Sequence, residues 1–521
     1  MKLNYKRTIL VGFAFFLISA FWQAYDATIP VILTNKFGMS QTWSGLIMAL
    51  DNILAVFMLP IFGALSDKCK SKHGKRTPFI TIGTIIAALA LVGLSFVDSA
   101  QLKNISDVAK IDDPAALAAI YDKQADATLQ TPDGNSFVLK DTMSKEEFVA
   151  ITSQIADPEN PEKKITNEAY TNYVAPARQA CAADATAAQP VTLILFITLL
   201  LGVLIAMATF RSPAVALMPD VTIKPLRSKA NAIINLMGTA GGILVLVLGI
   251  VFATSAVKNA MMNYTTYYGV IAGIMVAALA IFLLTVRETK WAKQMQTDSL
   301  ALGIEENEPE DLTEKRGLSK SEKRSLLLIL ASIALWYIGY NAVTSKYSLY
   351  ASSVLSMDYN TTLLIAQGAA IISYLPAGIV ASKIGRKKTI LAGVVTLTTA
   401  FAAASFMRAG SSPLLMNVLF ALAGIGWATI NVNSFPMVVE MCSGADIGKY
   451  TGYYYTASMA AQIVTPIFSG FLMDLPGLGM TVLFPYAAIF AGLAFMTMFF
   501  VKHGDAKPES KKGLEALDID D

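Results

Sequence analysis

Four ionisable residues lie inside long apolar stretches of the sequence, where a charge is expensive. Asp26 and Asp51 lie in the first two stretches, Arg211 in the fourth and Lys346 in the seventh. Each costs about 2.5 to 3.5 kcal/mol in the middle of a membrane, so it needs a partner or a watery cavity. A carboxyl there can bind and release a proton, and Arg211 offers five donors to hydroxyl or carboxylate groups. These residues indicate a solute pathway, although mutual pairing of two acids and two bases is a structural alternative.

Amide and aromatic side chains accompany these charges. Sugars need paired donors and acceptors around the ring and an aromatic plate for their C–H faces. The same residue types also join helices or fill cores, so each one alone is weak evidence. The predicted proton-coupling groups are Asp26 and Asp51, and the predicted solute-binding residues, with Trp22 beside them, are Gln23, Asp26, Arg211, Tyr340, Asn341, Gln367, Asn431 and Asn433.

Residues for metal or triad chemistry are sparse. The two histidines, His73 and His503, lie in polar segments, and Cys69, Cys181 and Cys442 are far apart in the sequence. No metal-ligand spacing, disulfide framework or catalytic triad can be built from them. We therefore expect no metal, no cofactor and no enzymatic activity.

The elements that position these residues are predicted to be membrane-spanning helices. The chain is 54% hydrophobic and 15% charged, against roughly 25% charged in soluble domains. A span needs about 20 apolar helical residues. The sequence predicts an all-α membrane protein with twelve transmembrane helices, at residues 8–34, 42–66, 77–97, 190–218, 229–255, 264–286, 325–353, 361–382, 388–407, 413–438, 450–474 and 480–502.

The placement of Lys and Arg predicts the orientation. Segments on the side of the N-terminus hold 28 of them, whereas the opposite side holds three outside one long polar insert. Basic segments stay in the cytoplasm, so both termini are expected there. We predict a monomer in the plasma membrane.

Two pairs of similar segments in the sequence predict two six-helix halves. Gly74 and Gly385, each in a basic loop, are 311 residues apart, whereas Pro213 and Pro436 are 223 apart. The difference of 88 residues places an insertion between helices 3 and 4. The predicted divisions are helices 1–3 (1–97), an external insert (98–189), helices 4–6 (190–286), a solvated central loop (287–324), the second half (325–502) and a cytoplasmic tail (503–521).

The insert and the basic loops carry further predictions. The insert could be a lid that captures solute or binds a partner, but we favour a tolerated expansion, because loops accept insertions at low cost. Most loop lysines serve orientation. The predicted gating residues are Asp67, Gly74, Arg76, Gly385 and Arg386 on the cytoplasmic side, and Lys346 as a partner of Asp26 at the external gate.

One stretch resembles a known family. Residues Gly63 to Gly83 include Ser66-Asp67, Gly74-Lys-Arg76 and Pro78-Phe-Ile80. They resemble the glycoside-pentoside-hexuronide:cation symporters of the major facilitator superfamily, and within them the proton-coupled sucrose transporter branch. Arg211 to Asp220 and Ile430 to Glu440 are similar to the corresponding segments. The resemblance implies the major facilitator fold, a solute site between the halves and symport of a sugar or glycoside by alternating access.

The sequence also departs from this family. The melibiose permease type binds sodium through carboxylates in spans two and four, and the matching positions here are Ala55, Leu59 and Arg211. We therefore expect a proton gradient rather than sodium to supply the energy. Asp26 matches an acidic position of the animal sucrose-transporter relatives, whereas Leu204 stands where the sucrose branch has its span-four acid. Two alternatives stay open: an exporter of drugs or metabolites, and a non-transporting sensor that binds a partner through the insert.

Overall fold

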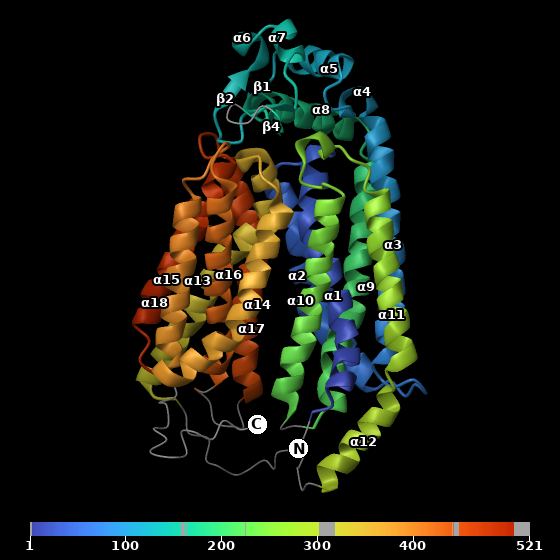
Figure 1. Ribbon diagram of the computed structural model, residues 1–521, viewed down its shortest axis with the longest axis vertical. Helices are drawn as coiled ribbons and strands as arrows, with labels where there is room; N and C mark the ends of the chain where they lie inside the picture. The colour runs from blue at the N-terminus through green and yellow to red at the C-terminus, as the bar shows by residue number, and fades with distance from the viewer. Residues whose placement is uncertain are drawn as a thin grey trace.

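The computed structural model describes residues 3–157, 162, 164–223, 226–301, 318–439, 441 and 447–504. Its long helices form two bundles that stand side by side, with the insert across one end (Figure 1). We call that end the insert side. The opposite end, where the first long helix begins and the last one ends, is called the terminus side.

Every predicted span corresponds to a helix. The first half contains α1 (Tyr5–Asn35), α2 (Gln41–Asp67), α3 (Thr77–Asn104), α9 (Val191–Val221), α10 (Arg227–Val251) and α11 (Thr265–Thr285). The second half contains α13 (Lys320–Tyr350), α14 (Tyr359–Ile384), α15 (Arg386–Ala404), α16 (Pro413–Val439), α17 (Ile447–Asp474) and α18 (Leu483–Phe499).

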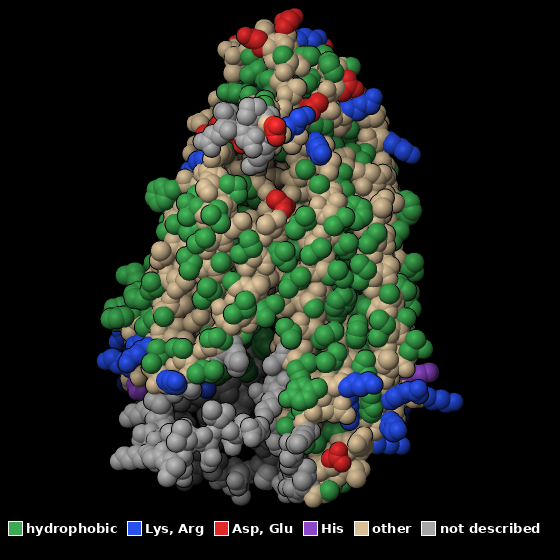
Figure 2. Space-filling view, viewed as in Figure 1, with side chains coloured by type: hydrophobic (Ala, Val, Ile, Leu, Met, Phe, Trp, Pro, Cys, Tyr) green, Lys and Arg blue, Asp and Glu red, His purple; other side chains and the backbone are tan. Residues whose placement is uncertain are grey.

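The all-α membrane fold class is confirmed. Over the described residues, ten of these helices are long and apolar enough to cross a membrane, and α14 and α15 do not meet that measure. Twelve crossings therefore remain a prediction. Large apolar side chains such as Leu89, Leu284 and Ile372 lie exposed, and apolar groups cover the outside of both halves (Figure 2). Such a surface requires lipid rather than water.

Three separate hydrophobic cores hold the molecule together. One lies within the first half, and one lies in the second half and includes Ala27 of α1; the insert has its own around Ile120, Phe148 and Cys181. Because each half is packed almost entirely around its own residues, the two can shift against each other without loss of either core.

The insert is a small mixed domain. Its β1 and β2 form one antiparallel hairpin, and β3 and β4 form another. Asp113 caps α5, and a capping box between Ser144 and Glu147 starts α7, as expected for these residue types. Its elements are α4 (Ser106–Ala109), α5 (Pro114–Gln124), β1 (Thr128–Gln130), β2 (Ser136–Val138), α6 (Leu139–Thr142), α7 (Lys145–Val149), β3 (Gln154–Ala156), β4 (Lys164–Thr166), η1 (Tyr170–Val174) and α8 (Ala175–Ala188).

The central loop does not begin as a solvated linker, so that prediction was wrong. It begins with helix α12 (Glu288–Ala301), and Glu288 is buried. Its carboxylate accepts hydrogen bonds from the backbone N–H groups of Arg76 (2.9 Å) and Thr77 (2.8 Å). An acid at this position complements the positive end of α3. The predicted linker at 302–317 and nearly all of the tail lie outside the described residues.

Gly74 makes this contact possible. Its φ of +114° is in the region that favours glycine, and a Cβ there would overlap the Glu288 carboxylate. Gly385, with a φ of +94°, occupies the matching place before α15. In both halves, a glycine with positive φ thus precedes the third helix, as the predicted repeat implies.

Substituting Gly74 tests this arrangement. Gly74→Ala adds both left-handed strain, about 1 to 2 kcal/mol, and a clash with Glu288. The matched control is Gly410→Ala, because Gly410 has a φ of +81° but open space around it. We expect a clearly larger fall in the apparent melting temperature of the purified protein for Gly74→Ala. Equal falls would contradict the proposed contact.

Candidate functional site between the two halves

A polar cavity of about 180 Å³ lies between the halves. Helices α1, α2 and α9 line it from the first half, and α13 and α17 line it from the second. The structure brings four of the predicted site residues together here, namely Asp26, Asp51, Arg211 and Asn341. The complete lining is Trp22, Asp26, Met48, Asp51, Asn52, Arg211, Asn341, Thr344, Ser345, Gln462 and Pro466.

The three charges in the cavity interact without direct pairing. Asp51 is close enough to influence both Asp26 and Arg211 electrostatically. Its Oδ1 accepts a hydrogen bond of 2.8 Å from Asn52 Nδ2. Among the described residues, no ion pair within 4.0 Å joins Arg211 to either carboxylate. The charges therefore face a shared space instead of neutralising one another.

Two buried donors in the cavity have no partner. These are the indole Nε1 of Trp22 and the amide Nδ2 of Asn341. The guanidinium carbon of Arg211 lies 5.6 Å from the centre of the Trp22 ring. An unsatisfied buried donor costs about 1 to 3 kcal/mol, and such groups call for an explanation in a native structure. Both donors belong to side chains that line the cavity, and each nitrogen is itself covered by protein in this conformation.

The other predicted solute ligands lie outside this lining. Gln367 Nε2 on α14 donates to Gln23 Oε1 on α1 at 2.5 Å, which joins the two halves. The ring of Tyr340 stacks on Trp427 with centroids 3.7 Å apart and planes 4° apart. Their roles in binding solute stay predictions.

The two asparagines of α16 are also occupied. Asn433 is buried, and its Nδ2 donates to the carbonyl of Thr429 in its own helix (2.8 Å). Asn431 forms a side-chain hydrogen bond with Tyr374. Neither residue lines the cavity between the halves in this conformation.

Sequence reasoning missed several residues that the structure places at the site. Asn52, Thr344, Ser345 and Gln462 line the cavity. Asn52 directly follows Asp51, and Thr344 and Ser345 directly precede Lys346. Their position next to charged residues in membrane helices could therefore have pointed to them. Gln462 offered only its polarity within an apolar stretch.

Lys346 does not pair with Asp26, so the predicted external gate pair is absent from this structure. Lys346 is fully buried, and its Nζ donates to the backbone oxygen of Gln41 (2.8 Å) and to its side-chain Oε1 (3.3 Å). It thereby joins α13 of the second half to the start of α2 in the first half. Its contact still crosses between the halves, but with a different partner.

Asp474 completes this contact on the insert side. Its carboxylate accepts hydrogen bonds from the backbone N–H of Gln41 (2.8 Å), the backbone N–H of Thr42 (2.7 Å) and the Thr42 hydroxyl (2.5 Å). The last residue of α17 thus caps the first turn of α2 from the other half, where a carboxylate complements the helix dipole. We call these contacts of Asp474 and Lys346 the α2 latch.

A second polar contact joins the halves on the same side. Ser255, just after α10, donates to Asp358 at 2.5 Å, and Asn360 Nδ2 donates to the hydroxyl of Thr254 at 3.0 Å. Burial raises the pKa of Asp358, but hydrogen bonds from Ser255 and Thr361 outweigh it and leave that pKa below its usual range. The carboxylate therefore stays charged at neutral pH.

The halves also pack tightly where α2 meets α17. A Cβ at Gly45 would overlap the backbone oxygen of Pro466, and one at Gly470 would overlap that of Gln41. This conformation is closed on the insert side.

The predicted gating cluster on the terminus side lies within the first half. The Arg76 side chain, nearly buried, bonds to Asp220 at the end of α9 (2.7 Å), to Asp67 at the end of α2 and to Ser66. With Glu288, this cluster joins α2, α3, α9 and α12. In the second half, Arg386 begins α15 and Gly385 directly precedes it. Their part in gating stays a prediction.

Removing the Asp474 carboxylate tests the α2 latch. Asp474→Ala deletes the acceptor of three hydrogen bonds, so we expect a loss of about 1 to 3 kcal/mol, seen as a lower apparent melting temperature. The control is Asp126→Ala, since Asp126 is an exposed insert residue paired with Lys140, for which we expect less than about 1 kcal/mol. Indistinguishable variants would show that the latch contributes nothing to stability.

Two family models match the chain. The Major Facilitator Superfamily model matches residues 359–518, and the MFS/sugar transport protein model matches residues 10–101. Sucrose transport protein SUC3 of Arabidopsis thaliana is 36% identical over 67 residues, which are 13% of this chain and 11% of that protein. Sucrose transport protein SUC4 of the same plant is 30% identical over 72 residues, 14% of each chain. The matched segment thus spans only a small part of these relatives.

Solved structures match over nearly the whole length. The inward-open xylose transporter XylE from E. coli has a TM-score of 0.57 at 14% identity, covering 99% of this chain and 100% of that one. A D-xylose-proton symporter gives 0.55 at 13% identity, with 96% and 99% covered. The peptide transporter POT with sulfate gives 0.57 at 9% identity, with 95% and 93% covered. At such low identities, these structural matches establish a shared fold and nothing further. The chain is a multi-pass membrane protein with the fold of the major facilitator transporters, and parts of its sequence resemble that superfamily and its sucrose transporters.

Proposed function

We propose that this protein is a secondary transporter that imports a sugar or glycoside together with a proton by alternating access. It resides in the plasma membrane as a monomer, with both termini in the cytoplasm and the insert outside. It uses no cofactor beyond the proton gradient. The family and the fold are those of transporters rather than enzymes.

The observation that carries this proposal is the charged cavity between the halves. Asp26, Asp51 and Arg211 come from three helices of the first half and meet Asn341 and Gln462 of the second. Intramembrane charges of this kind mark solute and ion pathways. A site at the junction of the halves is also where alternating access places its solute.

The charge balance of the cavity favours a coupled proton. Two carboxylates and one guanidinium leave one net negative charge if both acids are ionised. A proton bound with an uncharged sugar would make the occupied cavity neutral, and a neutral cavity crosses between conformations at lower electrostatic cost. We assign that proton to Asp26, with Asp51 as the second coupling group.

The hydrogen-bonding groups favour a hydroxylated solute. The cavity combines the Arg211 guanidinium and the free donors of Trp22 and Asn341 with the Thr344 and Ser345 hydroxyls. Sugars present acceptors and donors around the ring that fit such a set. The similar proteins include a sucrose transporter and a xylose transporter, which supports the same class of solute.

An exporter of drugs or metabolites is the second candidate. The burial of Asn433 against its own helix fits that hypothesis, since this asparagine is unavailable to a sugar here. Against it, the cavity is lined by charges and amides, whereas an apolar solute would favour an apolar lining.

Uptake of radiolabelled sugars by proteoliposomes tests the proposal. We expect accumulation of at least one mono- or disaccharide when the pH is lower outside than inside, and loss of accumulation when the gradient is collapsed. Failure of every sugar tested to respond to the gradient would contradict it.

Asp26→Asn should separate coupling from translocation. The amide keeps the size of the side chain but cannot carry the proton. We expect loss of gradient-driven accumulation while exchange of labelled for unlabelled sugar continues. The exposed insert variant Asp126→Asn should keep both activities. Intact accumulation in Asp26→Asn would remove Asp26 from the coupling role.

Arg211→Lys should weaken sugar binding. Lysine keeps the charge but loses the planar fork of donors. Loss of one or two hydrogen bonds predicts a KM about tenfold higher or more, and Arg211→Gln should be worse. An unchanged KM in Arg211→Lys would show that the guanidinium does not contact the solute.

A further inference from the structure

Hydrogen bonds and close packing attach the insert to the first half. Gln179 Nε2 of α8 donates to Asn35 Oδ1 at the end of α1 (3.0 Å). Gln101 Nε2 of α3 donates to the hydroxyl of Thr186 on α8 (3.0 Å). Gly38, with a φ of +64°, brings its backbone against α8 so closely that a Cβ would overlap Ala183. The insert and the first half therefore move as one body.

The tip of one insert hairpin contacts the second half. The backbone N–H of Gly477 donates to the oxygen of Gly134 (2.8 Å), and that of Met480 donates to the oxygen of Pro132 (2.7 Å). Pro132 and Gly134 lie in the turn between β1 and β2. Gly477 and Met480 lie in the connection from α17 to α18. We call this pair of hydrogen bonds the clip.

Glycines on both sides let the two backbones meet at the clip. Gly134 has a φ of +87°, and its Cβ would stand 2.6 Å from the backbone nitrogen of Gly479. Gly479 has a φ of +56°, and its Cβ would overlap the backbone nitrogen of Gly134. A side chain at either position would push the loops apart. The clip thus joins backbone to backbone and requires glycine on both sides, which argues against an accidental contact between two loops.

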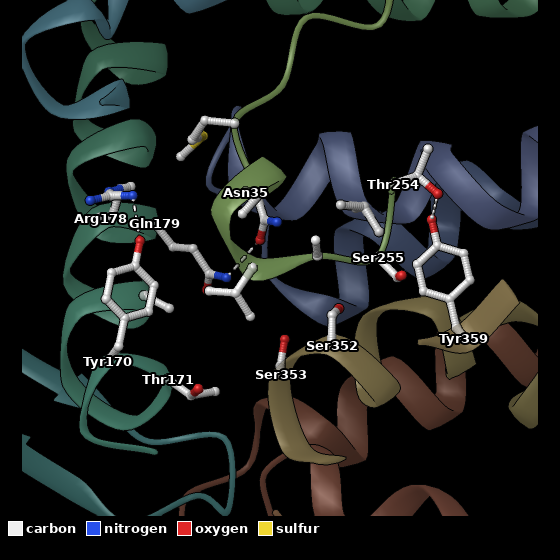
Figure 3. A pocket seen from close by; sticks show the side chains of 16 residues that line it. Asn35, Tyr170, Thr171, Arg178, Gln179, Thr254, Ser255, Ser352, Ser353 and Tyr359 are labelled. Carbon is white, nitrogen blue, oxygen red and sulfur yellow. Dashed lines mark hydrogen bonds between the residues drawn. The ribbon is translucent and has the colours of Figure 1, made fainter. Parts of the chain in front are cut away.

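Away from the clip, the insert and the second half are separated by a cavity of about 60 Å³ (Figure 3). Tyr170 and Gln179 of the insert lie on one side of it, and Ser352 and Ser353 of the second half lie on another. The space is enough for a few water molecules. The insert is therefore not fused to the second half along its length.

The clip lies next to the α2 latch. Asp474 ends α17, and the clipped connection follows at once, from Leu475 to Met480. Holding that connection also holds the Asp474 carboxylate over the first turn of α2. The two contacts therefore support each other on the insert side.

We propose that the insert is a strap that holds the insert side closed. It is anchored on the first half and clipped to the second, so the two hydrogen bonds of the clip must break before the halves can part on that side. The strap biases the protein towards the conformation closed on the insert side. This inference uses the alternating access of the proposed function, but it is independent of the solute.

Opening of the insert side can be measured without transport. A cysteine at Thr344, which lines the central cavity, is introduced where Cys69, Cys181 and Cys442 have been replaced by serine or alanine. A membrane-impermeant maleimide is added to intact cells, and the rate of labelling reports exposure of the cavity to that side. Labelling of Asp126→Cys, an exposed insert position, first verifies that the insert faces the reagent.

The strap is released by Gly134→Ala or Gly479→Ala, which act on opposite partners of the clip. We expect labelling on the order of tenfold faster in each, because loss of two hydrogen bonds shifts a two-state equilibrium by about that much. The double variant should label no faster than the quicker single variant, since both break one contact. Gly410→Ala, with positive φ but no close neighbour, should label at the parental rate.

Unchanged or slower labelling in the folded glycine variants would overturn the strap and leave the insert as a passive cap. Folding is checked by thermal unfolding of each purified variant, and either partner of the clip suffices if the other variant fails to fold. Because labelling needs no solute, this result is distinct from a failure of sugar uptake.

Discussion

Charged side chains inside the membrane determine how this structure must be built. Asp26, Asp51 and Arg211 cannot face lipid, and they do not neutralise one another by direct contact among the described residues. They require a polar chamber, and the junction between two separately packed halves supplies it. The donors of Trp22 and Asn341, which have no hydrogen-bond partner, also favour a polar environment at this junction.

The contacts that close the insert side are suited to opening again. Besides the close packing of α2 against α17, they are hydrogen bonds at helix ends and loops, namely the α2 latch, the Asp358 contact and the clip. Each can be exchanged for hydrogen bonds to water at a modest net cost. The cluster of Arg76 and Glu288, in contrast, lies within the first half and holds the helices of that half together. Polar contacts between halves and apolar cores within them together favour rigid-body motion.

Much of the fold could be predicted because lipid thickness sets the length of apolar helices. The prediction for α2 was 42–66, and the helix is Gln41–Asp67. The spacing of Gly74, Gly385 and two prolines located the insert. The errors lie where polar contacts override composition. Helix α3 runs on to Asn104, where Asp98 pairs with Lys36, and the buried Glu288 begins α12 in the predicted central loop.

The candidate site was predictable only in part. Intramembrane charge pointed to Asp26, Asp51 and Arg211, and these do share a cavity. The contacts of the α2 latch could not be inferred, because Gln41 is 305 residues from Lys346 and 433 residues from Asp474, and these residues meet only after both halves have folded. The clip was equally hidden, since backbone-to-backbone contact between loops leaves no periodicity in the sequence.

If the cavity binds a sugar and a proton together, sugar that enters must bring protons with it, and this proton movement can be measured. Proteoliposomes with no initial pH gradient receive a sugar on the outside, and the external pH is followed with time. We expect the medium to become more alkaline as protons enter with the sugar, and a protonophore to abolish this change. Sugar entry with no accompanying change in pH would contradict it.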